Sequence, residues 1–175
     1  MKARNINEVA HEWLSEICNK NTIAIDATAG NGVDTAFLAT KCRQVIAFDI
    51  SMQAIKNTRE ACMHLNNVII LHQSHDQMIN YIRKADVVVF NLGYLPSGDK
   101  SIITQPESTI RALNQAKMIL GSGYIGITCY LGHPGGKEEH SDVLNWLQQN
   151  TVIVKSYTYP IEDSPIAYLA KIKDR

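Results

Sequence analysis

The chain has 175 residues, 45% of them hydrophobic, and its 17 basic and 17 acidic side chains give a formal net charge of zero. This length and composition predict one domain, spanning residues 1–175, with a core of its own. Zero net charge excludes a chain-wide electrostatic attraction to nucleic acid or to a membrane surface, although a local basic patch is compatible with it.

The cysteines and the apolar segments narrow the class of protein further. Cys18, Cys42, Cys62 and Cys129 are widely spaced, without a Cys-x-x-Cys pair or matching histidines. Such spacing predicts reduced, mainly buried thiols, with neither a disulfide framework nor a metal site. No signal peptide opens the sequence and no apolar run approaches the length of a membrane span, so we expect a cytoplasmic protein without membrane contact.

The first predicted element is an amphipathic helix over residues 5–18. Apolar side chains recur at helical spacing from Ile6 to Ile17, whereas Glu8, Glu12 and Glu16 fall on the opposite face. This periodicity indicates a helix that packs one side against a core.

A strand over residues 22–26 then leads into a turn that holds Gly30 and Gly32. Because glycine lacks a Cβ atom, both positions can adopt positive φ and bring the backbone close to a ligand, while the next helix offers free N–H groups at its start. A dinucleotide-binding turn wants a third glycine where Thr35 stands, and the carboxylate of Asp26 would repel a pyrophosphate. S-adenosylmethionine has an ammonium, a sulfonium and a ribose diol but no phosphate. The turn therefore favours this cofactor over NAD, with a plain turn that binds no ligand as the alternative.

The second predicted strand, residues 44–49, ends in Asp49. An acid at this point can accept hydrogen bonds from both ribose hydroxyls. The alternative is that Asp49 caps the helix that begins near Ser51. Because Ser51 can cap that helix alone, we favour ribose binding.

The remaining periodicity alternates strands and helices almost to the end of the chain. Strands are predicted over residues 68–71, 85–91 and 123–130, and helices over 106–120 and 137–149. Short apolar runs separated by helices indicate parallel strands that are buried on both faces. Two last strands, 152–159 and 167–173, are joined by residues 161–166 without a helix and form a closing antiparallel hairpin. The pattern predicts an α/β protein of the Rossmann-like class I methyltransferase fold, with a seven-stranded, mainly parallel sheet, a C-terminal antiparallel hairpin and helices on both faces.

Polar residues follow the fourth predicted strand, in the segment 90–100. Ligands of open α/β sheets bind beyond the carboxyl ends of the strands, where Asn91 lies. Its side chain can accept a hydrogen bond from an amine, and Tyr94 can stack on a planar substrate. The segment resembles the Asn/Asp-Pro-Pro-Tyr loop of enzymes that methylate amino groups, but Leu92 and Gly93 replace the two prolines, so another contact must make the loop rigid. The alternative is a strand end followed by a turn and a packed aromatic side chain.

Five segments together resemble one family. They are residues 26–35, 48–50, 74–75, 91–100 and 130–138. They are similar to the small bacterial enzymes called putative rRNA methylases, a family associated with the MnmM-type tRNA 5-aminomethyl-2-thiouridine methyltransferases. The resemblance covers nearly the whole chain, and Ser97 departs from it where the family commonly has glycine.

The resemblance implies a reaction in which S-adenosylmethionine methylates the aminomethyl nitrogen of a modified wobble uridine in the tRNA anticodon stem-loop. The product is 5-methylaminomethyl-2-thiouridine. The reaction is a direct displacement, so the enzyme supplies alignment and a desolvated pocket, and the substrate ammonium must first lose a proton. The implied catalytic residues are Asn91, Tyr94, Asp99 and His133, with Lys100 shaping the same loop. The implied cofactor-binding residues are Asp26, Ala27, Thr28, Gly30, Asn31, Gly32, Asp34, Thr35, Asp49, Ile50, Gln53, Ser74, His75, Asn91 and Leu92.

The proton acceptor stays open at this point, with His75, His133, Asp99 and Asp34 as candidates. His75 either caps the following helix or lines the adenine pocket, and for His133 we favour substrate contact over a plain surface turn. The other four histidines are interpreted as surface residues without a chemical role: His11, His64, His72 and His140.

Two other classes of function stay open as well. One is an S-adenosylmethionine-dependent methyltransferase of rRNA, of a small amine or of a protein, because donor and fold do not fix the substrate. The other is a non-catalytic binding protein that kept the fold. The hairpin and the apolar helix faces are compatible with a homodimer, and no metal is expected.

Overall fold

The computed structural model describes residues 4–93, 98–99, 101 and 104–174. The elements follow one another in the order α1 (Ile6–Ile17), β1 (Ile23–Asp26), α2 (Val33–Lys41), β2 (Gln44–Asp49), α3 (Met52–Ala61), β3 (Val68–His72), the 3-10 helix η1 (His75–Asn80), β4 (Val87–Leu92), α4 (Pro106–Leu120), β5 (Tyr124–Cys129), α5 (Gly136–Asn150), β6 (Thr151–Thr158) and β7 (Ile166–Ile172).

In the described part of the chain the strands form one seven-stranded sheet, in the order β3-β2-β1-β4-β5-β7-β6. The first five strands in chain order are parallel, and β7 pairs antiparallel with both β5 and β6. This confirms the predicted fold class, including the closing hairpin. The strand order reverses between β1 and β4, where Asp26 pairs with Val89. In open α/β sheets, ligands bind at such a switch point.

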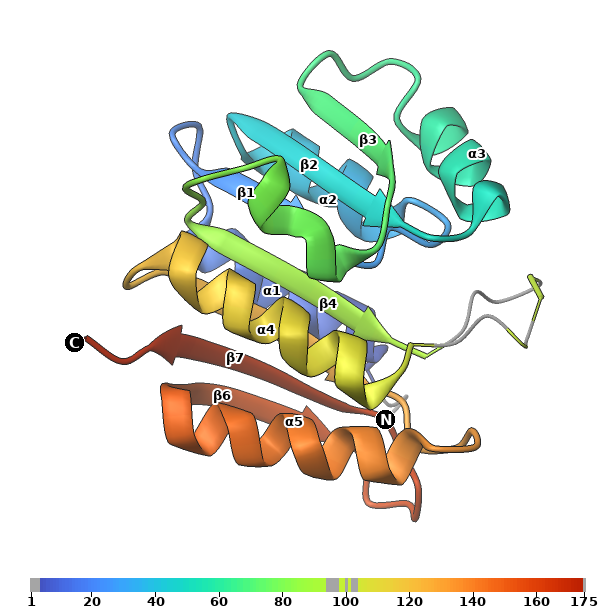
Figure 1. Ribbon diagram of the computed structural model, residues 1–175, viewed down its shortest axis with the longest axis vertical. Helices are drawn as coiled ribbons and strands as arrows, with labels where there is room; N and C mark the ends of the chain where they lie inside the picture. Colours follow the sequence, from blue (N-terminus) through green and yellow to red (C-terminus); the bar gives the residue numbers. More distant parts are fainter. Residues whose placement is uncertain (1–3, 94–97, 100, 102–103, 175) are drawn as a thin grey trace.

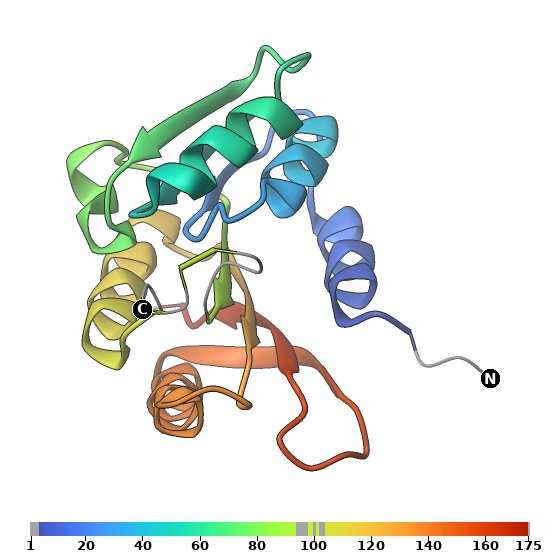
Figure 2. The ribbon, with the colours of Figure 1, turned by 90° about the vertical axis from the view of Figure 1, so that its right-hand side faces the viewer.

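Helices cover both faces of the sheet (Figure 1). Figure 2 shows α1 and α2 on one face, and η1, α4 and α5 on the other. Neighbouring residues of β4 show why both faces need cover: Val89 packs in the cluster that contains Leu38 of α2, and Phe90 packs in the cluster that contains Leu113 of α4. Successive side chains of a strand point to opposite faces, so a run of apolar residues such as 87–90 needs cover on both faces of the sheet.

The sequence accounts for the helix starts. The side chain of Asn5 accepts a hydrogen bond from the backbone N–H of Asn7 at the start of α1, and Ser51 accepts one from Ala54 at the start of α3. Pro106 stands in the first turn of α4, where its missing N–H costs nothing. Ser51 thus caps α3, which leaves Asp49 for another role.

The closing hairpin leaves β6 at the edge of the sheet. Val152 and Val154 expose about half of their surfaces there, and the pairing with β7 is irregular between Ile153 and Lys155. None of the helices within the described residues has both the length and the apolar character that crossing a bilayer requires.

Candidate functional site

A cavity of about 910 Å³ lies at the carboxyl edge of the sheet. Its size is that of a site for a small molecule. It is lined by the ends of five strands and the loops that follow them: residues 27–31 at β1, 49–51 at β2, 74–76 at β3, 91–93 at β4 and 130–133 at β5.

The glycine turn after β1 adopts the predicted conformation. Gly30 has φ of 56° and Gly32 has φ of 81°, both in the left-handed region. The turn approaches its neighbours closely, because a Cβ atom on Gly32 would lie 2.8 Å from the Cα atom of Thr58. Gly32 is also the N-cap of α2 and offers no side-chain cap to that helix, whose first residues Val33 and Asp34 line the cavity.

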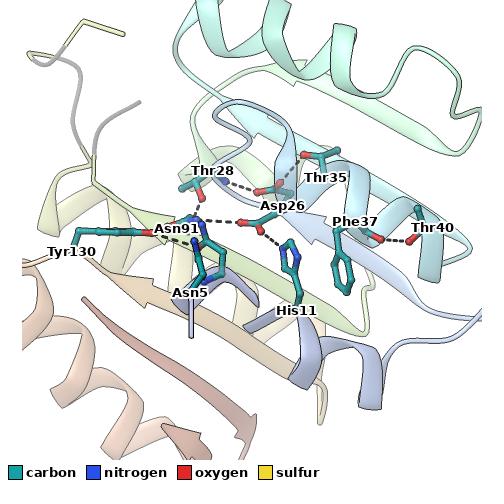
Figure 3. Close-up of polar contacts among 11 residues, drawn as sticks. Asn5, His11, Asp26, Thr28, Thr35, Phe37, Thr40, Asn91 and Tyr130 are labelled. Atoms are coloured by element: carbon teal, nitrogen blue, oxygen red, sulfur yellow. Dashed lines mark hydrogen bonds and ion pairs between the residues drawn. The ribbon is translucent and has the colours of Figure 1, made fainter. Parts of the chain in front are cut away.

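Asp26 stabilises this turn from the interior of the protein and does not line the cavity. Its carboxylate is fully buried and accepts hydrogen bonds from the backbone N–H of Thr28, at 3.1 Å, and from the hydroxyl of Thr35, at 2.6 Å. Burial, with the negative charge of Asp34 adding to it, raises the pKa of Asp26 to about 7. The hydroxyl of Thr28 in turn accepts the backbone N–H of Asn91 at 2.6 Å (Figure 3). Asp26 and Thr28 therefore fix the turn against β4.

Asp49 connects the end of β2 to the glycine turn. One carboxylate oxygen accepts the backbone N–H of Gly30 at 3.0 Å, and the other accepts that of Ser51 at 2.8 Å. A carboxylate has about four acceptor positions, so these two bonds leave capacity for further donors. Asp49 and Ile50 both line the cavity.

His75 closes the cavity on the side of β3. Its side chain is 7% exposed, and its Nδ1 atom lies 3.2 Å from the carbonyl oxygen of Ala27. Burial lowers the pKa of His75, which favours a neutral ring. Ser74 holds the N-cap position of η1, so His75 lines the pocket and does not cap the helix.

The end of β4 places Asn91 opposite the glycine turn, as predicted. Its Nδ2 atom donates a hydrogen bond to Oδ2 of Asp34 at 3.2 Å. Thr104 clamps Gly93, because its hydroxyl accepts the N–H of Gly93 at 3.0 Å and its own N–H donates to the carbonyl of Gly93 at 2.9 Å. The same hydroxyl donates to the buried carboxylate of Glu139 in α5 at 3.0 Å. This clamp supplies the rigidity that two prolines would give at the base of the loop.

Two of the other predicted catalytic residues are described by the structure. Asp99 and His133 line the cavity, whereas Tyr94 and Lys100 lie outside the described residues. Of the predicted cofactor-binding residues, four do not line the cavity: Asp26, Gly32, Thr35 and Gln53. Within the described residues no group of three or more His, Cys, Asp or Glu side chains is arranged to hold a metal ion.

The structure places at the site one residue, His11, that the sequence analysis interpreted as a surface residue without a chemical role; that interpretation is wrong. His11 of α1 is only 18% exposed, its Nε2 atom lies 2.6 Å from Oδ1 of Asp34, and its ring stacks on Phe37 with centroids 3.9 Å apart. One helical turn earlier, Asn7 lines the cavity and accepts a hydrogen bond from the hydroxyl of Tyr130 at 3.4 Å. The spacing of four residues puts Asn7 and His11 on one face of α1. This spacing is the one feature of the sequence that could have indicated that both residues face the site.

The lining of the cavity has an excess of negative charge. In the part of the chain that the structure describes, five aspartates and one arginine line it: Asp34, Asp49, Asp76, Asp99, Asp163 and Arg111. A lining with this excess of acids suits a cationic ligand and disfavours a phosphate.

Comparisons with known proteins agree with this geometry. A family model described as putative rRNA methylase matches residues 45–167. The crystal structure of a putative rRNA-methylase from Clostridium thermocellum is similar to this chain, with 33% identity, a TM-score of 0.88, and coverage of 99% of this chain and 100% of that one. A putative methyltransferase from Streptococcus mutans, solved in complex with SAH, is 35% identical with a TM-score of 0.85 and the same coverage.

A curated relative is the chloroplastic tRNA (mnm(5)s(2)U34)-methyltransferase of Arabidopsis thaliana, which is 35% identical over 78% of this chain. The match spans 56% of the relative, so the chain corresponds to little more than half of that protein's length.

Proposed function

Because the chain belongs to the putative rRNA methylase family, we propose that this S-adenosylmethionine-dependent methyltransferase acts on the wobble uridine of tRNA. The substrate in this proposal is the 5-aminomethyl group of 5-aminomethyl-2-thiouridine, and the product is 5-methylaminomethyl-2-thiouridine. The observation that carries the proposal is the position of Asn91, which stands at the switch point of the sheet in a cavity with an acidic lining. The similarity to the Arabidopsis thaliana tRNA methyltransferase supports the choice of substrate.

The residues of the cavity fit S-adenosylmethionine. When bound, this cofactor supplies a methyl group on a sulfonium centre. In our proposal Asp49 accepts the two ribose hydroxyls with the acceptor positions that Gly30 and Ser51 leave unused. Ile50 and His75 border the adenine, and the neutral ring of His75 adds no positive charge there. The acidic lining favours a cofactor that carries an ammonium and a sulfonium.

Asn91 aligns the acceptor nitrogen. The hydrogen bond from its Nδ2 atom to Asp34 fixes the plane of the amide, so that its carbonyl oxygen can accept an N–H group of the substrate. The Thr104 clamp keeps the backbone after Asn91 in place without prolines. Alignment of this kind is the main contribution that a protein makes to a direct displacement.

We propose that Tyr94, Asp99 and His133 complete the substrate side of the site. An unstacked anticodon base that stacks on Tyr94 would explain how a chain of zero net charge selects its RNA, because recognition then depends on the base more than on phosphates. A homodimer and a cytoplasmic location stay predictions.

The test is methylation of hypomodified tRNA that carries 5-aminomethyl-2-thiouridine, followed by mass spectrometry of the nucleosides. Wild-type protein should form the methylaminomethyl product, and Asn91→Ala should lower turnover roughly 100-fold with little change in cofactor affinity, because the alanine removes alignment of the acceptor only. Asn66→Ala, at an exposed position away from the cavity, is the matched control.

Two outcomes would contradict the proposal. Methyl transfer into rRNA, a small amine or a protein, with no product in tRNA, would favour the other substrate classes. Absence of heat in a calorimetric titration with S-adenosylmethionine would favour a non-catalytic protein.

A further inference from the structure

We propose that Asp34 accepts the proton that the substrate ammonium must lose, and that His11 is the residue that positions Asp34 and controls its basicity. The inference rests on the proposed function, because only an amine substrate needs this step. An alkylammonium has no lone pair, so it cannot attack the methyl carbon until a proton has left.

Asp34 bridges the acceptor side of the cavity and α1. It lies in the first turn of α2 and lines the cavity, where its Oδ2 atom accepts the side-chain N–H of Asn91 at 3.2 Å. Its Oδ1 atom lies 2.6 Å from Nε2 of His11. The carboxylate of Asp34 therefore has one oxygen bonded to Asn91, the residue that aligns the amine, and the other bonded to His11.

The other candidates are less well placed for this step. Asn91 points to the face of the sheet that α1 and α2 cover. Phe90, which precedes Asn91 in β4, points to the opposite face, and the ring of His75 lies against it there. Asp99 is exposed, and hydrogen bonds from Ser101 lower the pKa of its carboxyl group, which weakens it as a base. The Nδ1 atom of His133 lies 3.0 Å from the carbonyl oxygen of Pro134 in its own loop.

The proton and the methyl group move in two linked steps. The ammonium N–H bond breaks, its proton moves to Oδ2 of Asp34, and its electron pair becomes the lone pair of the nitrogen. That lone pair forms the new N–C bond to the methyl group while the C–S bond breaks and leaves its electron pair on sulfur. Asp34, now a carboxylic acid, returns the proton to solvent.

Desolvation lowers the free-energy cost of this proton transfer. In water, an amine holds its proton about 9 kcal/mol more tightly than a carboxylate does, from reference pKa values of about 10.4 and 3.9. The transfer turns an ion pair into two neutral groups, and a site that excludes water penalises the ion pair. The side chain of Asp34 is only 13% exposed. The buried carboxylate of Asp26 lies close enough for the charge of Asp34 to contribute to its raised pKa, and the charge of Asp34 acts in the same direction on Tyr130.

A second cavity, of about 20 Å³, is lined in part by Asp34 and Asn91. Asn7, Asp34, Asn91 and Thr128 contribute polar groups to its lining. This volume is enough for one water molecule, and the polar groups are sufficient to bind it. A water molecule bound there would lie beside Asp34 and could be the first acceptor of its proton.

His11 controls Asp34 through charge as well as orientation. A neutral imidazole donates one N–H to the carboxylate, whereas an imidazolium places a full positive charge beside it and weakens it as a base. Three titratable groups lie near the pair: Asp26 of β1, Tyr130 after β5, and Lys41 of α2, whose Nζ atom lies 5.9 Å from the ring of Phe37. Glu8 and Glu12 of α1 are exposed to solvent.

The test uses Asp34→Asn and His11→Phe in the full chain, with single-turnover methylation of tRNA bearing the aminomethyl group measured from about pH 6 to about pH 9.5, toward the range where alkylamines lose protons. At neutral pH we expect Asp34→Asn to lower the rate roughly 100-fold or more, as for loss of a general base. His11→Phe keeps an aromatic ring to stack on Phe37 but cannot hold the carboxylate, and should lower the rate roughly tenfold. Both defects should shrink as pH rises, because the substrate then arrives already neutral.

Two further variants keep the result interpretable. His11→Gln can still donate an N–H to the carboxylate of Asp34, so it should recover part of the rate that His11→Phe loses. His64→Gln, at an exposed position outside both cavities, is the control. Unfolding temperature and the calorimetric affinity for SAH show whether each variant keeps its fold and its cofactor site.

The outcomes separate this inference from the proposed function. A wild-type protein that does not methylate the aminomethyl group would refute the proposed function. An active wild-type protein whose His11→Phe variant is equally fast at every pH would overturn the role of His11. Defects in Asp34→Asn that stay constant with pH would overturn the role of Asp34 as proton acceptor.

Discussion

Gly32→Ala tests whether close packing, in addition to backbone conformation, requires glycine in the turn after β1. Gly32 has φ of 81° and ψ of 10°, and a Cβ atom there would lie 2.8 Å from Cα of Thr58 and 2.9 Å from Cβ of Ala61. Both neighbours belong to α3. Neither a backbone atom nor a Cβ atom can rotate away as the end of a long side chain can. The added methyl group must therefore displace the glycine turn or α3.

A second glycine in the same conformation separates the two contributions. Gly135 is the N-cap of α5, with φ of 80° and ψ of −3°, and a Cβ atom there would meet nothing within 4 Å. For Gly135→Ala we expect only the cost of a left-handed alanine, about 1–2 kcal/mol. For Gly32→Ala we expect this cost plus about 1–3 kcal/mol for overpacking. In a chain of this size the extra term corresponds to a difference in Tm of roughly 2–12 °C.

Urea and thermal unfolding of both variants measure this difference, and calorimetry with SAH provides a second readout. Gly32→Ala should also weaken cofactor binding, because Gly30 and Asn31 of the same turn line the cavity, whereas residue 135 does not. Equal destabilisation of the two variants would refute the packing argument and show that α3 accommodates the methyl group.

Two further variants test the carboxylates at the ends of β1 and β2. The folded-state pKa of Asp26, about 7, lies above its unfolded value, so the stability that its protonated form contributes is fully present below about pH 4 and lost as pH rises through about 7. The free energy of unfolding of the wild type relative to Asp26→Asn should therefore fall by on the order of 4 kcal/mol across this window, and a difference that urea unfolding finds independent of pH would contradict the burial argument. Asp49→Ala should raise the calorimetric Kd for S-adenosylmethionine roughly 10- to 100-fold, because hydrogen bonds to a charged group are lost, while the exposed control Asp142→Ala should not. Unchanged affinity in the Asp49 variant would argue against ribose binding by this residue.

The sequence predicts the fold well because the signals of the elements are local. The bounds of α4 and β2 agree with the predicted ranges of 106–120 and 44–49. The other elements for which the sequence predicts bounds differ from them by one or two residues, and the segment after Ser74 forms a 3-10 helix. Apolar runs at a period of two or 3.6, glycines in the turn and Ser51 as a cap each depend on a few neighbouring residues. The same local signals identify the cavity-forming loops.

The sequence does not predict which way the polar side chains of the site point. Asp26 ends its strand beside a cofactor turn, yet its carboxylate points into the protein toward Thr35 and not into the cavity. A side chain of a strand can point to either face of the sheet, and the sequence alone does not show which face Asp26 takes. Its buried carboxylate needs a hydrogen-bond donor, and the hydroxyl of Thr35 supplies one inside the protein.

The nature of the chemistry at this site was thus already present in the sequence, in a glycine turn, acids at strand ends and an asparagine after the fourth strand. The pairs that give these residues their roles come only from the tertiary structure. His11 meets Asp34 across 23 residues, Thr104 meets Glu139 across 35, and Tyr130 meets Asn7 across 123. Such contacts depend on where α1 and α5 pack against the sheet, and packing is decided by the sum of many weak apolar contacts that no short stretch of sequence contains.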